Sequence, residues 1–292
     1  MKILGTGLTG LIGSRVVEIL ALKGYEFEDI SKETGIDITD RAAVKRTIER
    51  SVAPWVFHFA AATDVQGSEN ERILGTSGAV WRVNVVATED IAALCLSLGK
   101  RMLYLSTDYV FDGKKQSYTE DDTPNPQGWY AVTKYEGEKR VRALLHNGLI
   151  VRIANPYRAN PQGKKDFVHK MIDRLSAGLT VSAPYDQLFV PTFIDDVARA
   201  IQMLIEGGAY GTYHVVGSSA VSPFDAAVEI ANVFEFDQTL VLKTTFAQFI
   251  RGRAPFPQFA ALQNKKAREY GITMSTFSEG LTDVKRQEQT RQ

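Results

Sequence analysis

The sequence predicts an α/β fold, a parallel sheet with helices on both faces, followed by a smaller and mainly helical lobe. Three observations lead to it. Apolar strand-like runs alternate with amphipathic stretches through about residue 150, the first run enters a glycine-rich turn, and loops and helices take over after Asn155. The expected strands lie at residues 2–6, 25–30, 54–59, 101–107 and 149–154, and the expected helices at 13–23, 40–50, 82–98 and 129–147. Later we expect helices over 166–177 and 194–205, a returning strand over 211–217, and helices with short loops from residue 222.

The first strand and helix are joined by glycines, for which two spacings fit. Gly5, Gly7 and Gly10 give G-x-G-x-x-G, and a shift to Gly7, Gly10 and Gly13 gives G-x-x-G-x-x-G. We prefer the second, because it leaves the strand intact and puts the third glycine at the start of the helix. A strand, a glycine turn and a helix form the context of a Rossmann-type dinucleotide site, where backbone N–H groups approach a pyrophosphate. The expected cofactor contacts in this turn are Gly7, Gly10, Leu11, Ile12 and Gly13.

Tyr130 and Lys134 lie four residues apart in the expected helix over 129–147, so they share one helix face. An isolated phenol has a pKa of about 10 and is a poor acid near neutral pH. A neighbouring ammonium would favour the phenolate and lower that pKa, which would suit the Tyr to proton transfer. Tyr and Lys also occur at this spacing by chance in many helices. The pair therefore indicates a functional site only in combination with the glycine turn.

The strand over 101–107 ends in hydroxyls and a carboxylate. Ligands of open α/β sheets bind outside the carboxyl ends of the strands, where Thr107 could reach a substrate oxygen. A plain polar turn would use the same residue types.

Composition limits the function classes. The 292 residues are 44% hydrophobic and 23% charged, and 34 basic side chains balance 34 acidic ones. We therefore expect neither a nucleic-acid nor a membrane partner.

The single cysteine, Cys95, excludes an internal disulfide, and the first strand begins at residue 2, so we expect a cytoplasmic protein. The four histidines show no metal-ligand spacing, and no metal is expected.

Taken together, these motifs resemble an extended short-chain dehydrogenase/reductase, and most closely the dTDP-4-dehydrorhamnose reductases. The resemblance runs along nearly the whole chain. Besides the glycine turn and the Tyr-x-x-x-Lys pair, it is carried by the segments at 35–40, 59–65, 106–113 and 191–198. It implies a Rossmann domain made of residues 1–155 and 190–218, interleaved with a substrate lobe made of 156–189 and 219–292.

The resemblance also implies roles for individual residues. Tyr130 would protonate the carbonyl oxygen of a nucleotide-linked 4-keto-6-deoxysugar as hydride arrives, and Lys134 would hold the nicotinamide ribose. Thr107 would steady the same oxygen, and Asp108 would reach a substrate hydroxyl. The remaining implied contacts are Asp37 and Ile38 near the adenine, Ala60, Ala61 and Ala62 beside the cofactor, Asn155 or Tyr157 in the sugar pocket, and Arg253 on the diphosphate.

Cofactor choice depends on the tip of the second strand. An acid there binds the ribose hydroxyls of NAD, whereas a base accepts the 2′-phosphate of NADP. Ser31 and Lys32 stand at the expected tip, which favours NADP(H) over NAD(H), although Asp29 is only two residues earlier.

The chain departs from the family pattern in places that leave other functions open. Gln66 stands where these reductases usually carry an acid, residues 72–82 look longer than usual, and Trp129 precedes the catalytic-type Tyr. A sugar 4-epimerase, or a regulatory subunit like the methionine adenosyltransferase β-subunits, remains an alternative. Tyr109 after Asp108 counts against a 4,6-dehydratase.

Members of the group sometimes dimerise, so a homodimer is one expected assembly. We expect residues 285–292 to form a frayed tail.

Overall fold

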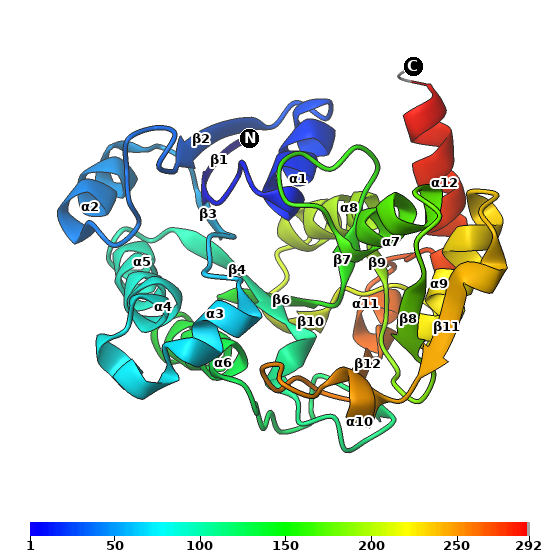
Figure 1. The fold of residues 1–292 in the computed structure, drawn as a ribbon. Helices are drawn as coiled ribbons and strands as arrows, with labels where there is room; N and C mark the ends of the chain where they lie inside the picture. Colours follow the sequence, from blue (N-terminus) through cyan, green and yellow to red (C-terminus); the bar gives the residue numbers. More distant parts are fainter. Residues whose placement is uncertain (291–292) are drawn as a thin grey trace.

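The computed structural model describes residues 1–290 and contains a six-stranded parallel sheet in the order β10-β6-β4-β3-β1-β2 (Figure 1). The chain passes from β1 to β2 on one side and then returns to β3 on the other, so its topological switch point lies between β1 and β3. The strands are β1 Lys2–Thr6, β2 Glu26–Ile30, β3 Trp55–His58, β4 Arg101–Thr107, β6 Leu149–Ile153 and β10 Gly211–His214. Each overlaps an expected strand, which confirms the predicted parallel sheet.

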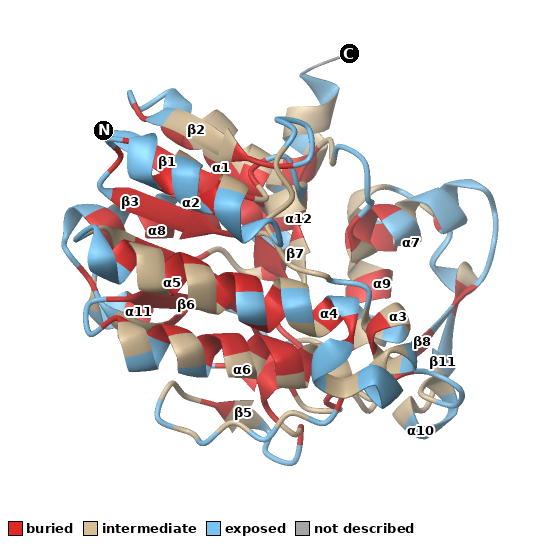
Figure 2. Ribbon diagram, turned by 90° about the vertical axis from the view of Figure 1, so that its left-hand side faces the viewer, coloured by how far each residue is buried: buried red, intermediate tan, exposed pale blue. Residues whose placement is uncertain are grey.

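Helices cover both faces of this sheet, because alternate side chains of every buried strand point to opposite sides. Helices α1 and α8 pack on the face that contains Ile3 and Phe57. Helices α2, α5 and α6 pack on the face that contains Leu4 and Val56. Figure 2 shows the buried strands between these layers, with exposed residues on the outer sides of the helices. The bounds are α1 Leu11–Ala21, α2 Arg41–Arg50, α5 Ala87–Ser97, α6 Trp129–Leu144 and α8 Ile194–Glu206.

Two predicted helices differ from the observed ones by three or more residues at one end. The helix expected over 82–98 is preceded by α4 Ala79–Trp81 and opens with a π-helical stretch, Arg82–Val86, before α5 begins. One wide turn shifts the following side chains around the axis, which residue periodicity cannot reveal. The helix expected over 129–147 ends at Leu144, where Leu145 takes an extended conformation.

A second hydrophobic cluster lies beside the sheet and draws on residues 157–193 and 221–284. Its helices are α7 Phe167–Ser176, α9 Pro223–Val233 and α12 Phe277–Gln289. Two strands, β8 Val181–Pro184 and β11 Val241–Thr244, pair in parallel at its edge. The remaining short elements are α3 Val65–Asn70, β5 Ser117–Tyr118, β7 Pro156–Tyr157, β9 Thr192–Phe193, α10 Phe246–Phe249, β12 Ala261–Leu262, α11 Lys265–Glu269 and three 3₁₀ turns, Arg72–Ser77, Asp108–Val110 and Gln238–Leu240.

The C-terminal segment is folded, contrary to the expected tail over 285–292. Helix α12 runs to Gln289, and its first turn carries a capping box between Thr276 and Glu279. Its apolar face packs into the second cluster through Phe277 and Leu281. Residues 291–292 lie outside the described part of the chain. None of the helices formed by residues 1–290 combines the length and apolar character needed to cross a membrane.

Candidate active site

The glycine turn between β1 and α1 brings three backbone segments into close contact. Gly7 has a φ of +68°, and a Cβ there would lie 2.5 Å from the backbone nitrogen of Ala60. A Cβ on Gly13 would lie 2.2 Å from the carbonyl oxygen of Gly7. Only glycine fits these two positions, so the turn packs tightly against both the loop after β3 and the first turn of α1. Leu11 and Ile12 open α1, with Gly10 as its N-cap residue.

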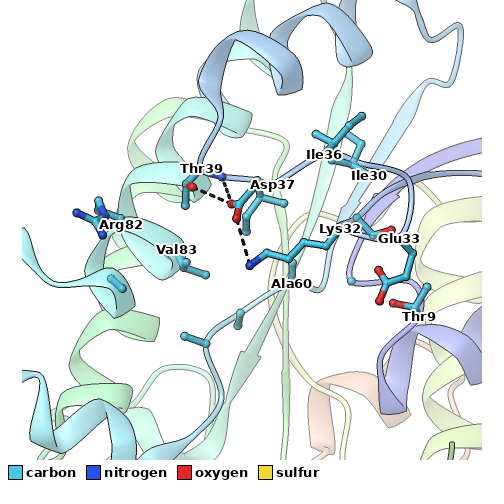
Figure 3. A pocket seen from close by; sticks show the side chains of 16 residues that line it. Thr9, Ile30, Lys32, Glu33, Ile36, Asp37, Thr39, Ala60, Arg82 and Val83 are labelled. Carbon is cyan, nitrogen blue, oxygen red and sulfur yellow. Dashed lines mark hydrogen bonds and ion pairs between the residues drawn. The ribbon is translucent and has the colours of Figure 1, made fainter. Parts of the chain in front are cut away.

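A cavity of about 520 Å³ opens from this turn, at the carboxyl ends of β1, β2 and β3 (Figure 3). It brings together Gly7 and residues from three predicted groups of cofactor contacts. These are Ser31 and Lys32 at the tip of the second strand, Asp37 and Ile38 near the adenine, and Ala60, Ala61 and Ala62 beside the cofactor. A glycine turn beside a cavity at the switch point is the arrangement in which open α/β sheets bind dinucleotides. The other lining residues were not predicted from the sequence, and they are Thr9, Ile30, Glu33, Ile36, Thr39, Ala79, Arg82 and Val83.

Asp37 is held in place at the middle of this cavity. Its carboxylate accepts hydrogen bonds from the N–H and hydroxyl of Thr39, and Lys32 Nζ lies 3.2 Å from it (Figure 3). Hydrogen bonds from Thr39 and the nearby Lys32 lower the pKa of Asp37. Glu33 points toward Thr9. The cavity therefore presents charges of both signs near the end of β2.

The reaction end of the site lies where β4 ends. The hydroxyl of Thr107 donates to Asp108 Oδ1 at 3.0 Å, and Tyr130 lies close enough for both residues to act on its pKa. The ring of Tyr109 packs edge-on against Tyr130, with centroids 6.1 Å apart. Thr107, Asp108 and Tyr130, which belong to separate sequence motifs, are thus brought together.

Burial changes the proton affinity of these groups. Burial raises the pKa of Asp108 to about 7, and Asp108 Oδ2 has no hydrogen-bond partner within residues 1–290. Burial and the nearby Asp108 also raise the pKa of Tyr130 above its usual value. The lowering expected from Lys134 does not occur in this state, because burial lowers the pKa of Lys134 itself to about 7.

Lys134 faces inward from α6. Its Nζ donates to the carbonyl oxygen of Leu105 at 2.8 Å and lies 4.1 Å from the ring centre of Tyr104. An ammonium has three donors, so this bond leaves further donor capacity.

Asn84 joins the loop after β3 to the start of α6. Its side chain accepts from the N–H of Ala62 at 2.8 Å and donates to Ala62 O and to Thr133 Oγ1. Thr133 in turn donates to the carbonyl oxygen of Tyr130. Asn84 lies in the π-helical stretch and is buried. Sequence reasoning missed this contact, and the unusual helix geometry that creates it has no clear sequence signal.

His58 lies beneath the site as a packed core histidine. Its ring nitrogens pair with Thr6 and Thr88 at 2.7 and 2.9 Å, and burial together with the charge of Lys134 lowers its pKa to about 3. The ring is therefore neutral at physiological pH.

The residues predicted for the sugar and diphosphate are more scattered. Asn155 has a φ of +41° at the end of β6, a backbone position that Asn tolerates. Tyr157 is fully buried among Phe167, Phe193 and Phe277, so it does not line a sugar pocket. Its aromatic ring packs in the second hydrophobic cluster. This placement could not be predicted from the position of Tyr157 after a strand. The guanidinium of Arg253 lies 4.2 Å from the ring centre of Phe249, in an exposed loop.

No group of three or more His, Cys, Asp or Glu side chains within the described residues is arranged to hold a metal ion.

A doubly wound parallel sheet, a glycine turn at its switch point and a Tyr-x-x-x-Lys pair on α6 whose lysine is buried define an NAD(P)-dependent oxidoreductase of the extended short-chain dehydrogenase/reductase type. The family model described as RmlD substrate binding domain matches residues 1–290, and the chain belongs to that family.

Individual relatives agree with this assignment. The chain is 33% identical to the probable low-salt glycan biosynthesis reductase Agl14 of Haloferax volcanii, with 94% of each chain covered. It is also 33% identical to the dTDP-4-dehydrorhamnose reductase of Mycobacterium tuberculosis, covering 92% of this chain and 86% of that one. Among solved structures, the dTDP-4-dehydrorhamnose reductase of Bacillus anthracis in complex with NADP superimposes with a TM-score of 0.89 at 29% identity, covering 98% and 99% of the two chains.

Proposed function

We propose that this protein reduces the 4-keto group of a nucleotide-linked 6-deoxysugar, with NADPH as the favoured hydride donor. The observation that carries the proposal is the grouping of Thr107, Asp108 and Tyr130 at the carboxyl end of β4, one helical turn from Lys134. The names of the family members support the sugar class.

In the proposed reaction, the bound dinucleotide supplies the hydride. The phenol of Tyr130 gives its proton to the carbonyl oxygen, and its raised pKa keeps that proton in place until negative charge develops on the oxygen. The hydroxyl of Thr107 gives a second hydrogen bond to the same oxygen. For that it must turn away from Asp108, to which it donates in the absence of substrate.

Asp108 and Lys134 are the other two polar side chains at the proposed reaction site. Asp108 Oδ2 is buried without a partner among residues 1–290, so a sugar hydroxyl that reached it would satisfy it. Lys134 keeps one bond to Leu105 O and offers its remaining donors to the nicotinamide ribose. A hydroxyl oxygen on Lys134 would favour the charged ammonium, which in turn would lower the pKa of Tyr130.

The substrate side of the proposal uses the second cluster and the loop that carries Arg253. We propose that residues 1–155 and 190–218 bind the cofactor and that 156–189 and 219–292 bind the substrate. Arg253 suits the diphosphate, because a guanidinium matches phosphate geometry and this one is exposed.

The NADP preference rests on Ser31 and Lys32 at the tip of β2. Lys32 is 80% exposed and pairs only with Asp37 among the described residues, so a 2′-phosphate could replace that weak pairing. Replacing Lys32 with Ala should therefore raise the KM for NADPH and leave that for NADH nearly unchanged. An equal change for both cofactors would contradict the assignment.

The direct test is oxidation of NADPH and NADH, separately, by the purified protein given dTDP-4-dehydrorhamnose or dTDP-4-keto-6-deoxyglucose. Sugar-dependent oxidation supports the proposal, and a faster rate with NADPH supports the cofactor preference. A protein that purifies with tightly held NAD⁺ and interconverts sugars without added reductant would be an epimerase instead. Cofactor binding without turnover of either sugar would favour a regulatory subunit.

A further inference from the structure

Helix α3 follows the loop of Ala60–Ala62 and packs against the first turns of α6 (Figure 1). It is only six residues long, and Asp64 caps its N-terminus. Two of its polar side chains, Gln66 and Glu69, lie one turn apart. Each accepts a hydrogen bond from the backbone of a different distant segment.

Gln66 contacts the loop formed by residues 250–257. Its Oε1 accepts the N–H of Ala254 at 2.8 Å, although the two residues are 188 positions apart. Ala254 follows Arg253 directly, so this bond fixes the backbone beside the proposed diphosphate ligand.

The same loop lies against the reaction end of the site. Phe256 stacks on Tyr109 with ring centres 5.9 Å apart, and Tyr109 in turn packs edge-on against Tyr130. A Cβ on Gly128 would lie 2.5 Å from the carbonyl oxygen of Pro255, so the loop packs directly onto the residue before α6.

Glu69 contacts the catalytic helix instead. Its Oε2 accepts the N–H of Trp129, the first residue of α6, at 2.7 Å. The N-cap residue of α6 is Gly128, which has no side chain to cap the helix. Glu69 therefore satisfies one of the free N–H groups at the positive end of α6, next to Tyr130.

We propose that α3 is a brace in which Gln66 positions the Arg253 loop for the substrate and Glu69 positions Tyr130 for proton transfer. Both are positioning residues, since neither is assigned a contact with the reacting atoms. This inference rests on the proposed reductase function.

The brace also explains why an uncharged side chain suits position 66. A carboxylate could accept the same N–H, but it would place a negative charge beside Arg253 and weaken the attraction of that guanidinium for a diphosphate. Gln66 keeps the hydrogen bond without this cost.

The experiment compares Gln66→Ala, Gln66→Glu and Glu69→Ala with Asn70→Ala, an exposed control on the same helix. Loss of one hydrogen bond corresponds to roughly a five-fold effect. We expect Gln66→Ala to raise the KM for the nucleotide sugar by about this factor with kcat nearly unchanged, and Gln66→Glu to raise it at least as much. We expect Glu69→Ala to lower kcat by a similar factor with little change in KM. The KM for NADPH should stay constant in all four variants.

Amide hydrogen exchange supplies a readout that does not need the substrate. Gln66→Ala should speed exchange across residues 250–257, Glu69→Ala should speed it in the first turn of α6, and Asn70→Ala should change neither. Unchanged exchange in both brace variants would overturn the inference, as would kcat, KM and unfolding midpoint shifting together. If the wild-type protein turns over no keto-sugar, the proposed function fails, while the exchange comparison still decides whether the brace exists.

Discussion

At the scale of single residues, burial makes the proton affinities in this site unlike those of the free side chains. Asp108 and Lys134 both have a pKa near 7, although one is an acid and the other a base. Both therefore gain or lose charge when a ligand contributes one hydrogen bond or one nearby charge. Tyr130 by contrast keeps its proton firmly until the reaction demands it.

Replacing Tyr130 with Phe should abolish turnover and leave cofactor affinity nearly intact. The ring still packs edge-on against Tyr109, and only the proton donor is lost. Steady-state kinetics and a cofactor titration by fluorescence provide the measurement. Weaker cofactor binding in this variant would show that Tyr130 acts as a structural residue.

Replacing Gly10 with Val should block the pyrophosphate while the chain still folds. A Cβ on Gly10 would lie 3.4 Å from Gly7 O, an acceptable contact. We expect the added methyl groups to occupy the position proposed for the pyrophosphate. Gly13→Ala is the contrasting variant, because its Cβ would collide with the same oxygen and lower the free energy of unfolding. Normal dinucleotide binding by Gly10→Val would refute the phosphate turn.

At the scale of elements, α6 is anchored to the sheet by buried charges. Glu138 on α6 forms a two-pronged pair with Arg152 on β6 at 2.8 and 2.7 Å, and both side chains are almost inaccessible to water. Burial acts to raise the pKa of Glu138, but Arg152 and Arg142 outweigh it and the pKa is lowered. The helix that carries Tyr130 and Lys134 is thus fixed in rotation relative to β6.

Replacing Glu138 with Ala should lower the free energy of unfolding by about 3 kcal/mol, because it leaves the guanidinium of Arg152 buried without its partner. The urea midpoint of unfolding measures this. Glu136→Ala is a matched control on the same helix, since Glu136 pairs with Lys139 at the surface and should cost under about 1 kcal/mol. Equal losses in the two variants would contradict the view that burial sets the cost.

At the scale of the whole molecule, charged side chains connect α1 to the substrate side. Arg158, which is 1% exposed, donates to Ser14 and Glu18 on α1. Arg15 pairs with Asp195 on α8 at 2.6 Å. Gln287 on α12 joins the same network, so the C-terminal helix is tied to the helix that follows the glycine turn.

His169 on α7 makes a second polar contact with α12. Its ring nitrogens pair with Asp166 and Glu288 at 2.9 and 2.8 Å. Burial acts to lower the pKa of His169, but hydrogen bonds to the two carboxylates dominate and raise it to about 9. Because the folded pKa lies above the unfolded value of about 6.5, the stabilisation is complete below pH 6.5 and is lost as pH rises through 9.

The His169→Gln variant should therefore be about 2 kcal/mol less stable than the wild type at pH 6, with the difference disappearing near pH 10. Denaturant unfolding at several pH values gives the comparison. His146→Gln, at an exposed histidine, serves as the control substitution. A difference that stays constant with pH would show that His169 contributes through packing alone.

Features that depend on local periodicity could be predicted from the amino-acid sequence. The alternation of strands and helices predicted the parallel sheet, because the spacing of apolar residues within each segment shows whether a strand or a helix buries them. The glycine turn and the Tyr130–Lys134 pair were predictable for the same reason, and the expected adenine contacts do line one cavity. The roles of these residues in binding and catalysis remain predictions.

Contacts that join distant segments could not be predicted from the sequence, because they depend on how the chain packs. The bond from Ala254 to Gln66, the placement of Tyr157 in the second cluster and the docking of α12 each depend on partners far away in sequence. The shifted pKa values of Asp108 and Lys134 could not be predicted from the sequence either. They result from exclusion from water, which is a property of the packed molecule and not of any short segment.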